Sequence, residues 1–349
     1  MQAWRVHGFG EPADTFVLDE VPEPTPADLE GFGMDLQGWV PVDENHEPFD
    51  DWVLMRVSVA ALALPDVTMS RGTYPVPVTR PYISGQEGVG VVVDAAPGRR
   101  DMIGKRVASV TIQPWGGLAP VSIGVGVASV EVPDAMSDED AAAFIIPAST
   151  AYHAAIRRGR VVAGETVAVL GAAGGLGGAI VQLCLAQGAR VIGIVGGPEK
   201  VAFCERLGAE AVDHTAGDFV AAVRERTGGR GVDAVMDPVQ GEMGAAARGL
   251  LVPDGRQVLC GHAGTLIPHD PYFYMYNHTL IGACNGAYPR ERFLRMNEET
   301  HDALAALVDA GRYRPIVDRC IEFKDVPAAL TDLAARRTIG RVVVRVGDS

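Results

Sequence analysis

The second half of the chain alternates short apolar runs with amphipathic segments. The apolar runs are expected to form strands and the segments between them helices, with strands at 165–170, 190–195, 209–214, 232–239 and 256–262, and helices at 175–187, 198–208, 218–229 and 242–250. Parallel strands need long crossover connections, and helices provide them. The pattern therefore predicts an α/β domain with a doubly wound parallel sheet.

The first half of the chain has a different pattern. Residues 1 to about 146 contain β-rich runs such as WVLMRVSVAA (52–61) and GVGVVVDAA (88–96), interrupted by Pro and Gly and with little helical periodicity. These runs predict a strand-rich, barrel-like domain. A helix near 298–311 and a terminal strand at 340–346 are expected to return to it, because the alternation of the second half stops near residue 286.

An acidic stretch at about 27–51, ADLEGFGMDLQGWVPVDENHEPFDD, interrupts what is otherwise a short connection into the strand at Trp52. Two interpretations stay open. The stretch is either a tolerated surface loop or a lid or dimer element, since long loops in compact domains are often functional.

A glycine-rich turn, GAAGGLG, follows the predicted strand at 165–170 and opens the next helix. In this spacing Gly171 permits a tight turn, Gly174 lets the backbone approach a pyrophosphate, and Gly177 allows close packing of helix on strand. Helix-terminal N–H groups then face the anion. We therefore predict a dinucleotide-binding turn that includes Gly175 and Leu176.

The end of the second strand indicates which dinucleotide is bound. An Asp or Glu there would bind the 2′-hydroxyl of NAD, but this chain has Val195, followed by Gly196, Gly197 and Lys200. Two small residues leave room for a 2′-phosphate and an ammonium can pair with it, so NADPH is favoured over NADH. The alternative for Lys200 is a solvated lysine in the first turn of a helix.

Composition and charge narrow the class of protein. The 349 residues are 48% apolar and 21% charged, which is typical of a globular protein with two domains. A net charge of −14 argues against nucleic acid and anionic membranes as partners. The N-terminus has no signal-like stretch and no window approaches about 18 apolar residues, so we expect a cytoplasmic protein. The five cysteines are widely spaced and predict buried thiols.

With these motifs in view, the chain resembles the medium-chain dehydrogenase/reductase superfamily, specifically its zinc-free, NADPH-dependent quinone oxidoreductase branch. The resemblance runs through MQAWRVHGFGEPAD, PDVTMSRGTYP, GQEGVGVVV, GAAGGLG, TGGRGVDAVMDPVQG and PDGRQVLCG, and fails at the 27–51 insertion. It implies a GroES-like catalytic domain (1–146 and 289–349), a Rossmann domain (147–288), and an active site in the cleft between them. It also implies a homodimer paired through the edge strand near 279–287.

The resemblance assigns further cofactor positions. His214 stands where many relatives have Tyr beside the 2′-phosphate, so it either contacts the phosphate or is a surface histidine. A C-terminal basic residue that also reaches this phosphate corresponds to Arg336, although Arg337 fits equally well. Positions expected beside the nicotinamide ring are Gly261, His262 and Cys284.

The resemblance also argues against a metal. Zinc-dependent relatives use an early Cys and the His of a Gly-His-Glu motif, but here Gln86 replaces that His and no Cys occurs before Cys184. We therefore expect no metal site. Glu87 is expected to be a buried structural acid.

Without a metal, reduction of a quinone or an α,β-unsaturated carbonyl compound is the easier chemistry, because the developing charge is delocalised. Tyr74 resembles by position a proton donor of enoyl thioester reductases, and the alternative is a packed tyrosine. Ala63, Trp115 and Tyr276 are expected to line the substrate pocket. Two other functions stay open: an enoyl thioester reductase with a basic entrance, and an NADPH-binding protein without catalysis. The entrance candidates are Arg71, Arg80, Arg290 and Arg292.

Overall fold

A computed structural model gives the fold of the chain. It describes residues 1–349 except 31–32, 35–40, 43–49, 75–77, 265–274, 285, 287, 289 and 348–349. Contacts between Cα atoms divide the chain into two compact units, the first made of 1–146, 286–301 and 315–349, and the second of 147–285 and 302–314. The second unit differs from the predicted domain 147–288 mainly by the segment 302–314, which the prediction assigned to the first domain.

The second unit is built on a six-stranded parallel sheet with the strand order β12-β11-β10-β13-β14-β15. The strands are β10 (Thr166–Leu170), β11 (Arg190–Val195), β12 (Glu210–Asp213), β13 (Val232–Asp237), β14 (Leu251–Leu259) and β15 (Thr279–Gly282). Numbered from β10, this order is 3-2-1-4-5-6, the Rossmann arrangement. The predicted doubly wound parallel sheet is confirmed.

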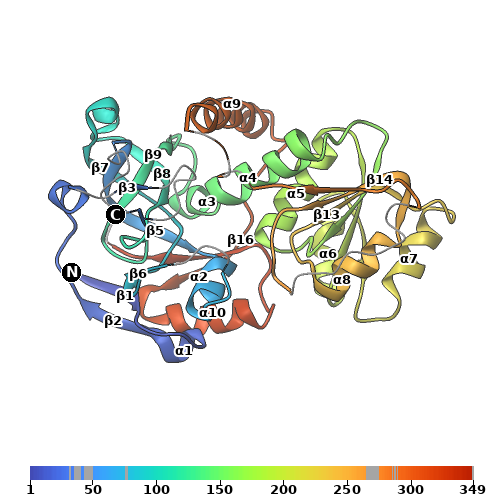
Figure 1. Ribbon diagram of the computed structural model, residues 1–349, viewed down its shortest axis with the longest axis horizontal. Helices are drawn as coiled ribbons and strands as arrows, with labels where there is room; N and C mark the ends of the chain where they lie inside the picture. The colour runs from blue at the N-terminus through green and yellow to red at the C-terminus, as the bar shows by residue number, and fades with distance from the viewer. Residues whose placement is uncertain are drawn as a thin grey trace. The chain divides into compact units, whose positions relative to one another are not determined.

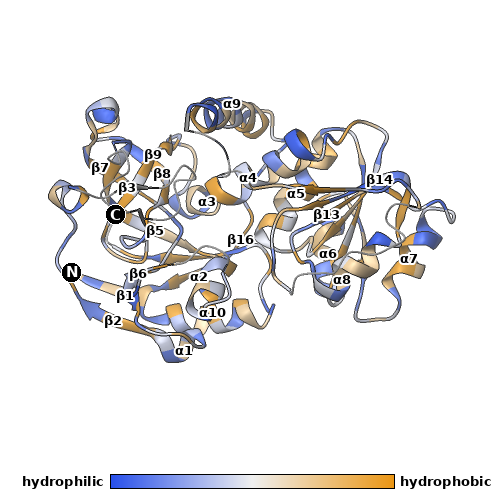
Figure 2. Cartoon of the chain, viewed as in Figure 1, coloured by the Kyte–Doolittle hydropathy of each residue, from blue (hydrophilic) through white to orange (hydrophobic). Residues whose placement is uncertain are grey.

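Helices surround this sheet, as Figure 1 shows. They are α4 (Ile145–Tyr152), the π-helix η3 (His153–Arg158), α5 (Gly175–Ala186), α6 (Pro198–Arg206), α7 (Phe219–Arg226) and α8 (Gly241–Arg248). Helix α5 packs on β10 and β11, whereas α8 packs on β13 and β14. All five residues of β10 are buried, and Figure 2 shows how apolar the central strands are. Strands covered on both faces need such continuous apolar runs.

The segment 302–314 belongs to the second unit because it is bonded to α5. The side-chain amide of Gln182 donates to the carbonyl oxygen of Arg314 at 3.0 Å, and its oxygen accepts from the N–H of Arg314 at 2.9 Å. The segment includes the end of α9 (Arg290–Asp309), which begins earlier than the helix predicted near 298–311.

The first unit contains a strand-rich barrel. Its main sheet has the order β16-β17-β5-β7-β8-β9, and an additional pairing of β5 with β9 closes the sheet on itself. These strands are β5 (Trp52–Leu62), β7 (Glu87–Ala95), β8 (Arg106–Thr111), β9 (Val121–Glu131), β16 (Val317–Glu322) and β17 (Arg341–Arg345). The C-terminal strands therefore return to this unit, and the GroES-like fold is confirmed.

Smaller elements complete the first unit. A second sheet has the order β2-β1-β6, and β3 pairs with β4. The remaining bounds are β1 (Gln2–Val6), β2 (Phe16–Glu20), β3 (Gly33–Met34), β4 (Pro41–Val42), β6 (Tyr82–Ile83), α1 (Pro12–Thr15), α2 (Leu64–Ser70), α3 (Asp138–Ala142), α10 (Val326–Ala334), η1 (Pro26–Leu29), η2 (Pro97–Met102) and η5 (Phe323–Asp325). Most of the predicted 27–51 insertion lies outside the described residues.

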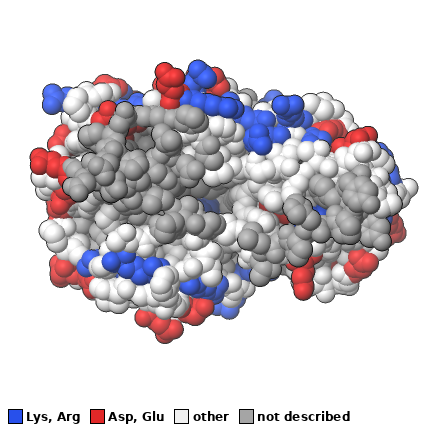
Figure 3. Space-filling model, viewed as in Figure 1, with Lys and Arg blue, Asp and Glu red and all other residues white. Residues whose placement is uncertain are grey.

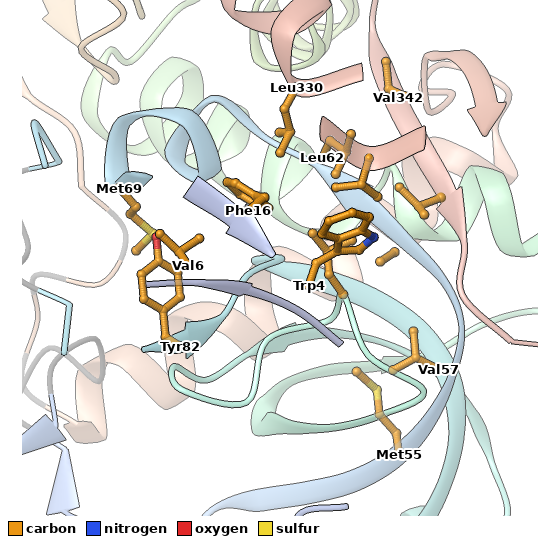
Figure 4. Close-up of a cluster of buried hydrophobic side chains, with 14 of the residues drawn as sticks. Trp4, Val6, Phe16, Met55, Val57, Leu62, Met69, Tyr82, Leu330 and Val342 are labelled. Carbon is orange, nitrogen blue, oxygen red and sulfur yellow. The ribbon is translucent and has the colours of Figure 1, made fainter. Parts of the chain in front are cut away.

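The core of the first unit joins segments from both ends of the chain. Trp4 and Leu330 are buried in one cluster, and the Trp4 indole N–H donates to the carbonyl oxygen of Phe323 at 2.7 Å. Figure 4 shows Tyr82 beside Met69 in the same cluster. Burial of these side chains holds the terminal segments in the barrel.

Charged side chains of both signs appear mainly around the margins of the view in Figure 3. This agrees with an acidic protein that also carries 30 basic residues. Within the described ranges, no helix combines the length and the apolar character that a membrane crossing requires.

Candidate functional site: the carboxyl edge of the parallel sheet

The glycine-rich turn connects β10 to α5. The N–H of Gly171 donates to the carbonyl oxygen of Ile194 at 2.9 Å, and the N–H of Gly174 donates to the carbonyl oxygen of Gly171 at 2.9 Å. These bonds hold the turn against the end of β11. Gly174, Gly175 and Leu176 are only half-buried, so a ligand can approach their backbone.

Close packing of α5 on this turn depends on Gly177. A Cβ atom at this position would collide with the carbonyl oxygen of Gly171, so only glycine fits. The first turn of α5 contains no acidic residue. The N-terminus of this 12-residue helix therefore offers N–H groups and a positive dipole end to an anion, and the residues fit a dinucleotide pyrophosphate.

The turn after β13 meets the glycine-rich turn. A Cβ atom at Gly171 would lie 3.4 Å from Cγ2 of Val239, which is ordinary contact. Strand β10 has β11 on one side and β13 on the other, so this contact marks the point where the strand order reverses. Ligands of open α/β sheets bind at such switch points, beside the carboxyl ends of the strands.

The loop after β11 has the open geometry that a 2′-phosphate requires. Gly197 has a φ of +93°, which favours glycine, and no atom lies within 4 Å of its absent Cβ. Val195 ends β11, and Lys200 is half-buried in the first turn of α6. His214 borders the loop, since Nε2 of its ring lies 3.1 Å from the position of a Cβ at Gly196.

Asp213, which no sequence motif marks as a site residue, anchors this loop. Oδ1 of Asp213 accepts hydrogen bonds from the N–H of Gly197 at 2.9 Å and from the N–H and hydroxyl of Thr215 at 2.9 and 2.6 Å. The Gly197 N–H chiefly holds the pKa of Asp213 below its usual value. The only feature of the sequence that could have indicated Asp213 is its place as a polar residue at the end of β12, where it pairs with Val195.

The loop after β14 carries two further predicted residues. Gly261 accepts a hydrogen bond at its carbonyl oxygen from the Gln240 side chain at 2.6 Å. His262 is half-buried, and burial lowers its pKa, so its ring is neutral near pH 7. Cys284 is exposed after β15. The cofactor residues predicted in the second unit thus occupy turns that follow β10, β11, β12, β14 and β15.

Of the four residues predicted on the substrate side, three belong to the first unit. Ala63 is buried and donates its N–H to Oδ2 of Asp66 at 2.8 Å. Tyr74 is partly buried and packs against the barrel core, and Trp115 packs against the apolar cluster that contains Leu54.

The fourth residue, Tyr276, belongs to the second unit. Its side chain is half exposed and stacks on His278, with the ring centroids 5.6 Å apart.

Among the C-terminal arginines of the first unit, Arg337 donates to Asp332 at 2.6 and 2.9 Å. Arg336 has a φ of 59°.

Gln86, at the position of the zinc-binding His of metal-dependent relatives, and the adjacent Glu87 are both bonded to other groups of the protein. Gln86 is buried, and its amide donates to Sδ of Met69 at 3.4 Å. Glu87 is buried and bonded to Arg341 and to the N–H of Ile146. Among the side chains that the structure describes, no group of three His, Cys, Asp or Glu lies close enough together to hold an ion.

Two of the four arginines predicted to form a basic entrance, Arg71 and Arg80, already bind other groups of the protein. Arg71 forms a bidentate ion pair with Glu11 at 2.6 and 2.9 Å. Arg80 donates to the carbonyl oxygen of Met69 at 2.8 Å and lies over the ring of Phe9. Arg292 lies over the ring of Tyr288, and the side chain of Arg290 is outside the described residues.

Comparison with known proteins gives two family matches. Residues 49–130 match the alcohol dehydrogenase GroES-like domain, and residues 175–302 match the zinc-binding dehydrogenase family. A solved structure of quinone oxidoreductase from Thermus thermophilus, also determined in complex with NADPH, is 31% identical. It covers 99% of this chain and 100% of its own, with a TM-score of 0.78.

Two curated proteins are also similar. The quinone oxidoreductase of Pongo abelii is 27% identical over 80% of this chain and 82% of its own length. The polyketide synthase GfsB of Streptomyces halstedii is 31% identical over 84% of this chain. The chain spans only 5% of GfsB, and 8 to 10% of further polyketide synthases that it matches.

Proposed function

Because the chain belongs to the medium-chain dehydrogenase/reductase superfamily, in its quinone oxidoreductase-like branch, we propose that it reduces a quinone or an α,β-unsaturated carbonyl compound with NADPH and without zinc. The superfamily consists of oxidoreductases that use a nicotinamide cofactor. The observation that carries the proposal is the glycine-rich turn at the switch point, together with a neighbouring loop that has no acidic residue at the end of β11.

The choice of NADPH rests on charge and space around Gly196 and Gly197. Lys200 supplies a cation in the first turn of α6, and the open side of Gly197 leaves room for a phosphate. Two acids adjoin this loop: Glu199 stands beside Lys200 in the first turn of α6, and Asp213 has its Oδ1 occupied by the loop N–H and by Thr215. The NADPH complex of the Thermus relative supports the same choice. We also propose that Arg336 contributes to this phosphate site.

The absence of zinc is proposed from the chemistry of two side chains. An amide such as that of Gln86 is a poor ligand for zinc. Glu87 already pairs with Arg341, so its carboxylate is committed to a cation of the protein. A reaction that delocalises its developing charge over a conjugated system does not need a metal to stabilise an alkoxide.

When bound, NADPH supplies a hydride, and one further proton completes the hydroquinone or the saturated carbonyl product. The protein's task is to orient the two reactants and to donate a hydrogen bond to the carbonyl oxygen of the substrate. We propose Tyr74 as this donor, because a phenol hydroxyl can donate a hydrogen bond and a proton to a carbonyl oxygen. Ala63, Trp115 and Tyr276 are proposed to line the pocket.

The test is NADPH oxidation, followed at 340 nm, with a benzoquinone, a naphthoquinone, an enone, an enal and crotonyl-CoA, each repeated with Tyr74→Phe. Turnover of an enone with at least about ten-fold loss in Tyr74→Phe, equivalent to ~1.4 kcal/mol of barrier, supports reduction of alkenes with Tyr74 as donor. Turnover of quinones alone, unchanged in the variant, removes Tyr74 from the mechanism. Binding of NADPH without turnover of any acceptor contradicts the proposed activity and favours a binding protein.

A second candidate is an enoyl thioester reductase, favoured by the similarity to polyketide synthases. It requires basic side chains that bind the phosphates of the thioester carrier. Arg71 and Arg80 are engaged by Glu11 and by backbone carbonyl groups, which weakens this candidate. Turnover of crotonyl-CoA that exceeds turnover of the simple enone, and that Arg292→Glu abolishes, would favour it over our first proposal.

We further propose a homodimer paired through β15. Among the described strands, β15 ends the sheet order, and Leu280 on it and the preceding Met275 are exposed large side chains. Exposed apolar groups beside an edge strand are typical of an interface.

A further inference from the structure

Gln240 has a backbone conformation that residues other than glycine rarely adopt. It directly precedes α8, and its φ of 59° and ψ of −150° lie in a region that is almost exclusive to glycine. Such conformations persist only where the surrounding structure enforces them, and they are concentrated at functional sites.

A buried hydrogen-bond network enforces this conformation. Oδ1 of Asp237, at the end of β13, accepts from the N–H groups of Val239 at 2.9 Å and Gln240 at 2.6 Å. Oδ2 of Asp237 accepts from the Gln257 amide at 2.6 Å, and Arg248 donates to the oxygen of Gln257 at 3.0 Å. The turn after β13 is thus fixed by contacts with β14 and α8.

The Gln240 side chain connects this turn to the loop after β14. Its amide donates to the carbonyl oxygen of Gly261 at 2.6 Å, and the N–H of Gly264 donates to the carbonyl oxygen of Val239 at 2.6 Å. The two loops that follow neighbouring strands are therefore bonded to each other in both directions. One of these two hydrogen bonds is made by the side chain of Gln240, a residue whose backbone conformation is unfavourable.

These joined loops lie at the switch point. Val239 is in contact range of Gly171, so the turn after β13 borders the turn proposed to hold the pyrophosphate. The loop at 261–264 follows the next strand of the same edge. A dinucleotide whose pyrophosphate lay on the glycine-rich turn would therefore extend its second half along these loops.

We propose that Gln240 is a positioning residue for the nicotinamide half of the cofactor. This inference rests on the proposed function, because it needs a dinucleotide at the switch point. By tying the Gly261 carbonyl to the turn after β13, Gln240 fixes the backbone on which the nicotinamide end is oriented. Its strained backbone conformation is retained because the side chain can reach Gly261 from there.

The test compares Gln240→Gly, Gln240→Ala and Asp254→Gly. Gln240→Gly removes the side-chain bond and relieves the backbone, whereas Gln240→Ala removes the bond and keeps the strain. Asp254 is a matched control, because it also has a positive φ, 63°, and lies in β14 with an exposed side chain. Binding of NADPH, of NADH and of adenosine 2′,5′-bisphosphate is measured by calorimetry, and thermal unfolding is measured on each apoprotein.

We expect Gln240→Gly to unfold within about 3 °C of the wild type, because relief of strain offsets the lost hydrogen bond. It should bind NADPH about ten-fold more weakly and adenosine 2′,5′-bisphosphate unchanged, since that fragment lacks the nicotinamide half. Gln240→Ala should lose the same affinity and unfold at a lower temperature. Asp254→Gly should bind all three ligands as the wild type does.

Unchanged or tighter NADPH binding by Gln240→Gly overturns the inference and leaves the proposed function intact. An equal loss of affinity for NADPH and for the bisphosphate fragment also overturns the inference, because the effect would then not be specific to the nicotinamide half. Failure of the wild type to bind either dinucleotide overturns the proposed function and this inference together. Normal binding by the wild type without turnover of any acceptor contradicts only the proposed activity.

Discussion

Glu87 and Arg341 form a buried ion pair in the first unit, although 254 positions separate them in the sequence. Arg341 donates to Oε1 of Glu87, and the N–H of Ile146 donates to Oε2 at 2.9 Å. Glu87 begins β7 and Arg341 begins β17, and these strands flank β5 on opposite sides. The pair therefore joins the C-terminal strand to the body of the barrel.

Arg341→Met should destabilise the protein by about 3–5 kcal/mol, because it leaves the Glu87 carboxylate buried without its cation. Urea unfolding followed by circular dichroism measures the loss. Arg345→Met, in the same strand but exposed, is the control and should cost less than about 1 kcal/mol. The double variant Glu87→Gln with Arg341→Met should recover part of the stability; an equal loss in Arg345→Met would contradict a specific role of the buried pair.

Lys200→Ala should weaken NADPH binding about ten-fold and leave NADH binding unchanged, because only NADPH carries the 2′-phosphate that an ammonium can pair with. The measurement is KM for each cofactor with the best acceptor of the panel. An unchanged KM for NADH shows that the variant is correctly folded. An equal rise of both KM values would show that Lys200 acts through the structure of α6 instead of through the phosphate.

Asp213→Ala should raise KM for NADPH about five-fold, because the Gly197 N–H loses its acceptor. Asp213→Asn retains an acceptor oxygen and should keep most of the affinity. Since the pKa of Asp213 is lowered, the contribution of its carboxylate is complete above the ordinary value of 3.8 and is lost as the pH falls through the lowered pKa. NADPH binding to the wild type should therefore show no Asp213 titration between about pH 5 and 8.

Thiol alkylation should separate the cysteines by burial. Burial raises the pKa of Cys184 to about 12 and that of Cys204 to about 11, and it also raises the pKa of Cys260, so these thiols should react only after unfolding. Cys284 and Cys320 are exposed and should react in the native protein. Mass spectrometry after iodoacetamide treatment identifies the sites. Saturating NADPH should protect Cys284 and leave Cys320 reactive; equal protection of both would contradict a cofactor contact at Cys284.

Leu280→Lys should shift the protein toward a monomer, because a charge on the edge strand β15 opposes pairing with a second copy. Sedimentation velocity measures the mass in solution. Val162→Lys, at another exposed apolar position of the second unit, is the control and should leave the assembly unchanged. A wild-type protein that sediments as a monomer would contradict the proposed homodimer.

Local patterns predicted much of the fold. The apolar runs and amphipathic segments of the second half marked its strands and helices in order, and GAAGGLG marked the turn between β10 and α5. The helix at Arg290–Asp309 begins earlier than the helix predicted near 298–311. The 302–314 segment was assigned to the first domain, because its bonds to Gln182 have no signature in the sequence.

The sequence by itself determined the elements, the glycine-rich turn and the loop without an acid after Val195, because helix and strand periodicity and glycine conformations are local properties of the chain. Only the tertiary structure decided that Asp213 anchors Gly197, that Gln240 reaches Gly261, and that Glu87 meets Arg341. Each of these contacts joins residues from different strands or loops. Which side chains meet there depends on the order of strands in the sheets, and that order is set by the packing of the whole unit.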